Sequence, residues 1–295
     1  MQIDVRFEHS YAITDKTMLP DEATYADDSD FIHEDESRKN IVVGVAADTL
    51  LISNLLVNDD KTEHTVIERG DRNTELWRNV KKLGSLLGDA EDIANRKQLA
   101  IAGMNEMKKI WIRKDRISEL RRLGLYGSLV KPILTYNCGT WAMTKKDEEN
   151  MDAFHRNQLR RTIGKTWPHR ISNKNLYKRC REKPISLFIT SSRWKLFGHI
   201  LRGDPRAPAF RAMLFYFERS DKKNFRGRPR CTIATTLDND IKKTAAKIDT
   251  FPLTQLKSIE DLLFISTIAQ DRVRWRRIIK DIMVVAKANK PIVFI

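Results

Sequence analysis

The chain has 295 residues, of which 41% are hydrophobic and 32% are charged, and its formal net charge is +15. This length allows two domains, and the hydrophobic content is sufficient for a folded core, which excludes a disordered chain. The three cysteines, Cys138, Cys180 and Cys231, are odd in number and widely spaced, which excludes a disulfide framework.

The charge is distributed unevenly along the chain. Residues 1–68 contain 5 Lys and Arg against 16 Asp and Glu, a net charge of −11, so residues 69–295 carry +26. A long basic segment is expected to bind a polyanion, most often nucleic acid. The alternative is that the charge only keeps the protein soluble.

The sequence predicts an intracellular protein of the cytoplasm and nucleus. Residues 1–7 lack the long apolar region of a signal peptide. The most apolar stretch, Ile41 to Val57, is too short to cross a membrane. It is also too polar, because it contains Asp48 and Asn54. No zinc site is expected, because Cys180, His199 and Cys231 lack the spacing of zinc ligands.

The front of the chain predicts short strands around one helix. Residues 22–34 are expected to form two strands that meet at Asp27 and Asp28, because adjacent aspartates suit a tight turn. A helix is expected from Ser37 to Ser53. Further strands are expected at 55–57 and 65–67, and a strand pair broken by Gly84 within 76–87.

From Asp92 onward the pattern is helical. Helices are expected over 92–111, 117–129, 191–201 and 271–287, the second ending near Lys131-Pro132. Thr144 and Asp147 form a capping-box pattern before an apolar face at Met151, Phe154, Leu159 and Ile163. Residues 221–230, rich in Lys, Arg, Gly and Pro, are the best linker candidate, and the alternatives are a phosphate-contacting loop and a nuclear-import patch.

The segment Tyr25-Ala26-Asp27-Asp28 has the sharpest chemical signal. Two carboxylates at a hairpin tip suit Mg²⁺, which prefers a few carboxylates together with waters and substrate phosphates. Phosphoryl transfer needs such a cation to neutralise charge on the attacking and leaving oxygens. An isolated Asp-Asp pair is more often an ordinary exposed turn.

The surrounding segments, in their order, resemble the non-LTR (LINE-type) retrotransposon reverse transcriptases. Residues 25–28 resemble the catalytic C motif, residues 54–63 the D motif, and residues 80–88 the E motif or primer grip. Further elements similar to those of this family follow at 136–141, 159–163, 197–202, 227–230 and 271–276. Each segment alone is weak evidence for the family. The ordered set is stronger, because it covers nearly the whole chain.

The resemblance implies roles for particular residues. Asp27, with Asp28 beside it, would bind the catalytic Mg²⁺, and Lys61 would protonate the leaving pyrophosphate. The nucleic acid would contact Tyr25 and Ala26 near the primer terminus, the hairpin residues Leu83 and Gly84, and the helix residues Arg160 and Arg161. The alternatives are an exposed turn lysine at Lys61 and an ordinary hairpin glycine at Gly84.

The sequence also departs from the family. Only 24 residues precede Tyr25, and none of them resembles the A motif, which supplies a further metal-binding aspartate. The B motif and the fingers are not found either. We therefore expect these 295 residues by themselves to be catalytically incomplete.

Basic runs with interleaved aromatic residues mark the helical part of the chain. Trp111, Trp194 and Trp275 lie in such runs, where they either stack on unpaired bases or, more often for any single tryptophan, belong to the core. His199 is expected to be a packed helical residue rather than a catalytic one.

The expected fold class is α+β and mostly helical. A partial reverse-transcriptase palm of short antiparallel strands and a helix spans 1–90, a helical thumb spans 91–165, and a basic helical region spans 166–295. The expected activity is RNA-directed DNA polymerisation, with dNTP as substrate and an RNA template and a DNA primer or target as partners. The alternatives are a non-catalytic nucleic-acid-binding remnant and a basic protein without a specific ligand.

Overall fold

The computed structural model of the protein describes residues 2–8, 22–25, 28–33, 36–52, 54, 56, 58, 62–68, 75–112, 116–165, 168–219 and 231–290. Side chains are described within these ranges from Ile41 onward, except at 42, 68, 112, 218 and 219. The chain divides into two units, 1–91 with 206–215, and 92–205 with 216–295. The three regions expected from the sequence, 1–90, 91–165 and 166–295, stay predictions.

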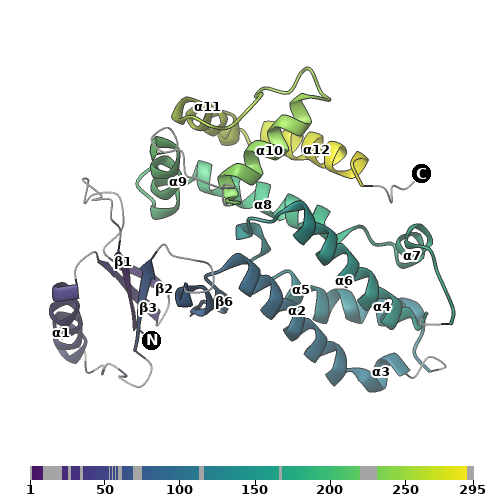
Figure 1. The fold of residues 1–295 in the computed structure, drawn as a ribbon, viewed down its shortest axis with the longest axis horizontal. Coiled ribbons are helices and arrows are strands. Elements are labelled where there is room, and N and C mark those ends of the chain that lie inside the picture. The colour runs from purple at the N-terminus through teal and green to yellow at the C-terminus, as the bar shows by residue number, and fades with distance from the viewer. Residues whose placement is uncertain are drawn as a thin grey trace. The chain divides into compact units, whose positions relative to one another are not determined.

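The fold is α+β and mostly helical, as the sequence predicts. In the first unit, a sheet has the strand order β2-β3-β1-β4, formed by β1 (Gln2–Glu8), β2 (Glu22–Tyr25), β3 (Asp28–His33) and β4 (Glu63–Glu68) (Figure 1). Strands β2 and β3 pair antiparallel, whereas β1 pairs parallel with both β3 and β4. Strand β1 is not among the predicted elements, and the expectation of antiparallel strands is wrong for this half of the sheet.

Helix α1 (Glu36–Ile52) connects β3 to β4. Parallel strands need such a crossover, because a short turn cannot return the chain to the same edge of the sheet. The predicted helix, Ser37 to Ser53, agrees with α1 to within one residue at each end. Its apolar residues Ile41 and Val45 are exposed, although their helical spacing predicts burial.

A 3₁₀ turn, η2 (Leu76–Asn79), leads to a small hairpin of β5 (Lys81–Lys82) and β6 (Ser85–Leu86). The strand pair broken at Gly84 is confirmed in this short form. Residues 65–67 lie in β4, as expected. Of the strand predicted at 55–57, only Leu56 is described, and it is not in a strand.

The second unit is helical (Figure 1). Its elements up to residue 202 are α2 (Asp89–Glu106), which begins in the first unit, α3 (Lys108–Ile112), α4 (Glu119–Leu125), the π-helical turn η3 (Tyr126–Val130), α5 (Lys131–Leu134), the 3₁₀ turn η4 (Cys138–Thr140), α6 (Lys145–Ile163), α7 (Asn173–Cys180) and α8 (Ile185–Arg202). They are followed by α9 (Pro208–Arg219), of which residues up to 215 belong to the first unit, and then by α10 (Ile233–Ala245), α11 (Ile259–Gln270) and α12 (Arg272–Ala288).

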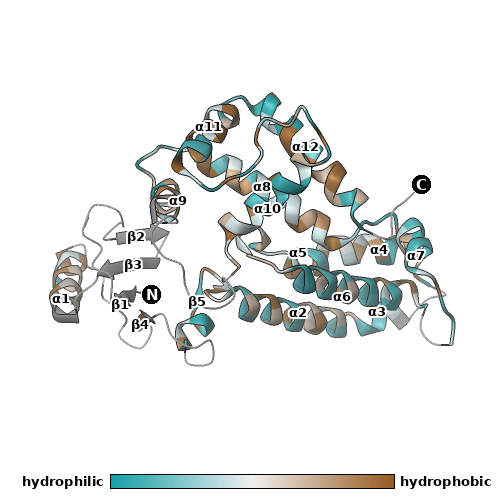
Figure 2. Cartoon of the chain, turned by 45° about the horizontal axis from the view of Figure 1, so that its top comes forward, coloured by the Kyte–Doolittle hydropathy of each residue, from teal (hydrophilic) through white to brown (hydrophobic). Residues whose placement is uncertain are grey.

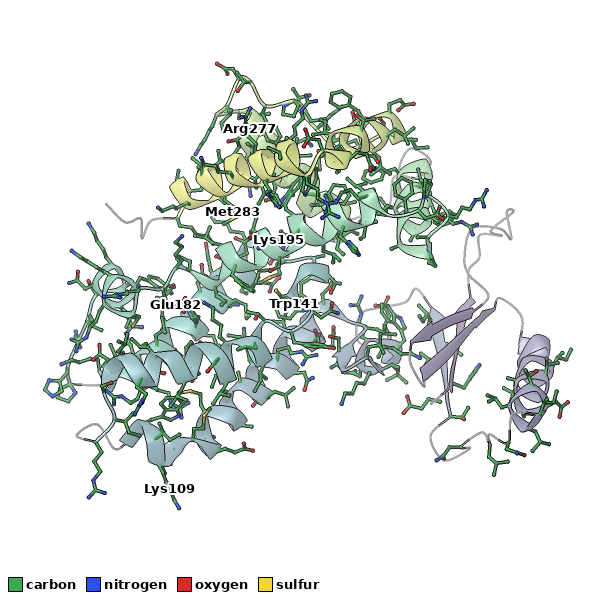
Figure 3. All side chains as sticks on the ribbon, turned by 180° about the vertical axis from the view of Figure 1, so that it is seen from behind. Lys109, Trp141, Glu182, Lys195, Arg277 and Met283 are labelled. Atoms are coloured by element: carbon green, nitrogen blue, oxygen red, sulfur yellow. The ribbon has the colours of Figure 1, made fainter. Side chains whose placement is uncertain are left out.

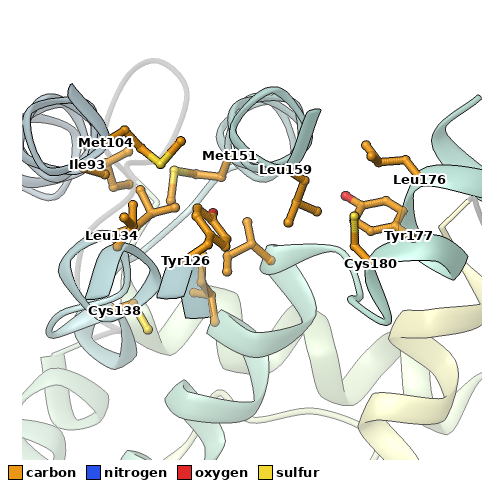
Figure 4. Close-up of a cluster of buried hydrophobic side chains, with 14 of the residues drawn as sticks. Ile93, Met104, Tyr126, Leu134, Cys138, Met151, Leu159, Leu176, Tyr177 and Cys180 are labelled. Carbon is orange, nitrogen blue, oxygen red and sulfur yellow. The ribbon is translucent and has the colours of Figure 1, made fainter. Parts of the chain in front are cut away.

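Hydrophobic and hydrophilic residues alternate along these helices (Figure 2), which is typical of helices that bury one face. On α6 the buried face contains Met151, Leu159 and Ile163, with Phe154 partly buried against it, as the sequence predicts. The capping box of Thr144 and Asp147 is confirmed at its start. Met104 of α2, Tyr126 of η3 and Leu134 of α5 meet Met151 and Leu159 in one hydrophobic core (Figure 4).

Helices α8 and α12 share a second cluster of buried residues. Trp275 of α12 packs against Trp194 and Phe197 of α8, with ring centroids 5.8 and 6.1 Å apart. The indole Nε1 of Trp275 donates a 3.2 Å hydrogen bond to the carbonyl oxygen of Trp194. The two helices are therefore held together by large apolar surfaces and by a satisfied buried polar group.

Candidate functional site

The hairpin with the candidate metal-binding aspartates is formed by β2 and β3. The strand β2 ends at Tyr25, β3 begins at Asp28, and these two residues lie opposite each other in the antiparallel register. Ala26 and Asp27 lie outside the described residues, as do Lys61 and the linker candidate at 221–230. The predicted pair of strands is confirmed, whereas Asp28, which the sequence analysis expects at the turn, is the first residue of β3.

The second candidate hairpin, β5–β6, turns at Leu83 and Gly84. Lys82 pairs with Ser85, so these two residues are the whole loop, and both have positive φ, 45° for Leu83 and 81° for Gly84. Positive φ at both central positions is the pattern of a type I′ turn, which normally has Asn or Gly in the first position. Leu83 is a branched residue in the left-handed region, which costs free energy, and its side chain is 52% exposed.

Arg160 and Arg161 lie in the last turn of α6. A guanidinium nitrogen of Arg160 donates to the Asn173 side-chain oxygen, and Arg161 donates to Asn105 Oδ1 at 3.0 Å and to Gln158 Oε1 at 3.3 Å. These acceptors are neutral, and neither arginine forms an ion pair with a described residue. The hydrogen bonds orient both arginines without neutralising them, which is compatible with the predicted phosphate contact.

The three tryptophans of the basic runs are core residues. Trp111, Trp194 and Trp275 are 6%, 0% and 3% exposed, and each indole N–H has a hydrogen-bond acceptor. Their rings are therefore unavailable for stacking on bases, and the core alternative is correct for all three. His199, which we expected to be packed, is exposed on α8 instead.

The second unit contains a buried polar cluster that the sequence does not predict. Tyr126 Oη lies 2.8 Å from Nδ1 of His155, and both residues are fully buried. Lys131 Nζ donates to both Glu182 carboxylate oxygens at 2.7 and 2.9 Å, and one of these oxygens lies 3.9 Å from His155 Nε2. Lys131 and Glu182 are separated by 51 positions, so no local pattern could indicate the cluster.

Burial dominates the chemistry of this cluster. It lowers the pKa of His155 to about 3, with the positive charges of Lys131 and Arg156 adding to the effect. It also raises the pKa of Tyr126 and raises that of the neighbouring Tyr177 to about 12. At neutral pH the histidine and both tyrosines are therefore uncharged. Without solvent access, Tyr126 and His155 are structural residues.

One cleft of about 670 Å³ opens between α6, α8, α10 and α12. Its walls contain acidic and basic side chains in similar numbers, and Lys290 Nζ is already bound to Glu148 and Asp152 at 3.1 and 3.2 Å. Burial raises the pKa of Asp240 in the wall of the cleft. The mixture of both charges selects neither an anion nor a cation.

Cys138 and Cys180 are buried, Cys231 is exposed, and all three are free thiols. The described residues contain no group of three or more His, Cys, Asp or Glu side chains that could hold a metal ion. No described helix has the length and hydrophobicity to cross a membrane. No known protein family, curated protein or solved structure matches the sequence.

Proposed function

We propose that this chain is the C-terminal part of a non-LTR-type reverse transcriptase, an RNA-directed DNA polymerase that adds dNTPs to a DNA primer on an RNA template. The observation that carries the proposal is the order of the motif-like segments, from Tyr25-Ala26-Asp27-Asp28 through residues 80–88 to residues 271–276. Two of these segments contain tight hairpins at the motif residues, Tyr25 with Asp28 and Leu83 with Gly84.

In this proposal the carboxylates of Asp27 and Asp28 hold Mg²⁺, which adjacent aspartates suit because Mg²⁺ binds through few carboxylates and keeps several waters. When bound, Mg²⁺ neutralises the charge of the transferred phosphoryl group. Lys61 donates a proton to the leaving pyrophosphate oxygen. The Leu83-Gly84 turn approaches the primer backbone, and the exposed, left-handed Leu83 supports this role, because strained backbone is often retained at binding sites.

The 295 residues by themselves are expected to be inactive, because the A motif that supplies the opposing metal-binding aspartate is not found among them. The test begins with the coding sequence upstream of Met1, which should contain an in-frame A motif and fingers. The longer product should extend a DNA primer on an RNA template with Mg²⁺, and Asp27→Asn should abolish the extension. Template-directed dNTP incorporation by the 295 residues alone would contradict the expectation of inactivity.

A second candidate is a nucleic-acid-binding remnant without catalysis. It is favoured by the net charge of +26 on residues 69–295, which suits nucleic-acid binding without catalysis. Stop codons in place of the A motif and fingers upstream would favour this candidate over the polymerase. Both candidates predict salt-dependent binding to RNA or DNA, whereas only the polymerase predicts primer extension by a longer product.

A further inference from the structure

The outward side of α12 carries a set of cations that we call the basic face: Arg272, Arg276, Arg277 and Lys280. All four are exposed, whereas the opposite side of α12 is buried through Trp275, Ile278, Ile282 and Val285. Arg272, Arg276 and Lys280 follow one another at intervals of four residues, so they form a row about 12 Å long. Arg277 lies on α12 and Lys195 on the neighbouring helix α8 (Figure 3).

The positive charge of the basic face is not compensated by acidic side chains of the described residues. None of its four cations forms an ion pair with an acidic residue in the part of the chain that the structure describes. Asp271 caps α12 by accepting from the backbone N–H groups of Val273 and Arg274, and Asp281 does not pair with Arg277 one turn away. The positive charge is therefore available to an external anion.

Arg202 of α8 extends the positive charge beyond α12. Its guanidinium donates a 3.2 Å hydrogen bond to the carbonyl oxygen of Ala269, which orients it. Burial, followed by the nearby positive charge of Arg272, lowers the pKa of Arg202. Ala269 lies three residues before Arg272, so the hydrogen bond from Arg202 places this guanidinium near the start of α12, beside the basic face.

The aromatic side chains at this position restrict the kind of partner. Trp194, Phe197 and Trp275 are buried between α8 and α12, so their rings cannot stack on bases. Proteins that hold single strands commonly combine basic residues with such stacking. The basic face offers charge alone, which contacts phosphates and carries no information on base sequence.

We propose that the basic face of α12, together with Arg202, binds the phosphate backbone of a nucleic-acid duplex without reading its sequence. This inference deepens the proposed function and rests on it for the choice of nucleic acid among polyanions. Each phosphate contact releases condensed counterions, so the affinity falls steeply with salt. The interaction would hold the duplex by its backbone while leaving the bases undisturbed.

The experiment compares two triple variants of the full 295-residue chain. The first, Arg276→Gln/Arg277→Gln/Lys280→Gln, removes three charges from the basic face. The matched control, Lys108→Gln/Lys174→Gln/Lys178→Gln, removes three exposed charges from α3 and α7 of the same unit. Fluorescence anisotropy measures binding to RNA–DNA hybrids of two unrelated sequences over a salt series. Thermal unfolding checks that both variants remain folded, as expected for exposed positions.

The basic-face variant should bind at least about tenfold more weakly, and its slope of log affinity against log salt should decrease by about 2–3, roughly one per lost contact. The control should lose about twofold or less, and the two hybrids should bind equally. Equal losses of affinity in both variants would mean that only the net charge of the protein matters, and this result would overturn the proposal. Tighter binding of a single strand than of a duplex would also overturn it.

A second binding experiment, with lipid vesicles, distinguishes a nucleic acid from an anionic membrane surface as the ligand of the basic face. Vesicles of phosphatidylcholine with phosphatidylserine are titrated with the same proteins. Binding to vesicles that is tighter than to the hybrid, and that the basic-face variant alone loses, would assign the face to a membrane surface and overturn the proposal. Primer extension tests the polymerase separately, so a failure there with intact duplex binding would sink the proposed function and leave this inference standing.

Discussion

Gly198 of α8 lies so close to the indole ring of Trp275 that a Cβ at this position would overlap the ring. The glycine lets α8 and α12 approach, and this approach allows the Trp275 N–H to reach the Trp194 carbonyl oxygen. The packing between the two helices therefore depends on a missing side chain as much as on the aromatic residues that are present.

Gly198→Ala should destabilise the second unit by about 1–3 kcal/mol, because the added methyl group forces the buried Trp275 ring to move. The matched control is Gly124→Ala in α4, where a Cβ would meet nothing within 4 Å. That substitution should stabilise the protein by up to about 1 kcal/mol through helix propensity alone. Urea unfolding at one pH measures both, and an unchanged midpoint for Gly198→Ala would contradict the tight packing.

The pKa of about 3 for buried His155 predicts that stability depends on pH. Below an ordinary pKa near 6.5 the unfolded chain binds a proton that the folded protein does not bind until about pH 3. The free energy of unfolding is therefore highest above pH 6.5 and should fall by up to about 1.4 kcal/mol per pH unit between pH 6.5 and 3. Urea unfolding at pH 7, 6 and 5 measures this slope.

Two variants identify the group responsible for that slope. His155→Gln removes the titrating ring, so its stability should fall less steeply with decreasing pH than that of the wild type. Tyr126→Phe removes the hydroxyl that lies 2.8 Å from His155 Nδ1 and should lower stability by about 1 kcal/mol while keeping the slope. A slope unchanged in His155→Gln would rule out the histidine as its source.

Asp152 joins three elements of the second unit. Its carboxylate accepts from the backbone N–H and the hydroxyl of Ser186 at the start of α8, and it pairs with Lys290. Asp152→Ala should destabilise the protein by about 3–5 kcal/mol, because it leaves buried donors and a half-buried lysine without their partner. Glu149→Ala, an exposed change on the same helix, should stay within about 0.5 kcal/mol. Similar thermal unfolding midpoints for the two variants would refute this role of Asp152.

The left-handed backbone of Leu83 predicts opposite effects at the two turn positions. Leu83→Asn should stabilise the β5–β6 hairpin by about 1 kcal/mol, because Asn tolerates positive φ better than Leu. Gly84→Ala should destabilise it, since its φ of 81° suits only glycine. Hydrogen exchange of the amides at 85–87 reports on this hairpin. Slower exchange in Gly84→Ala than in the wild type would contradict the turn assignment.

The sequence predicts correctly those elements that are marked by residues close together in the chain. The capping box at Thr144 and the apolar spacing behind it locate α6, and the apolar residues on either side of the Asp-Asp pair indicate β2 and β3. The start of α11 was missed although Ser258 and Asp261 repeat the Thr144–Asp147 pattern and form a capping box. That omission was avoidable, because the signal was present in the chain.

Other features depend on contacts between distant residues, and no local pattern encodes them. β1 joins the sheet through parallel pairs with strands that follow it by many residues, and the cluster around His155 depends on three helices folding together. For the candidate site, the sequence supplied Leu83 and Gly84 as turn residues, but only the backbone dihedrals reveal the strain at Leu83. The sequence predicts the cations of α12 directly. For Trp275, which lies among them, it allows either stacking on bases or burial in the core, and the structure shows burial.

The π-helical turn η3 has a further consequence for how this protein tolerates change. The predicted helix end near Lys131-Pro132 is wrong, because the wider turn at Tyr126–Val130 carries the helix on to Leu134 with the proline in the first turn of α5. Such a turn is equivalent to one residue inserted into an α-helix, which rotates the side chains on its two flanks by about 100° relative to a regular helix. Deleting a single residue between 127 and 130 would restore regular helical geometry yet turn either Tyr126 or Leu134 out of the core, so this stretch should accept substitutions far more readily than a change of length.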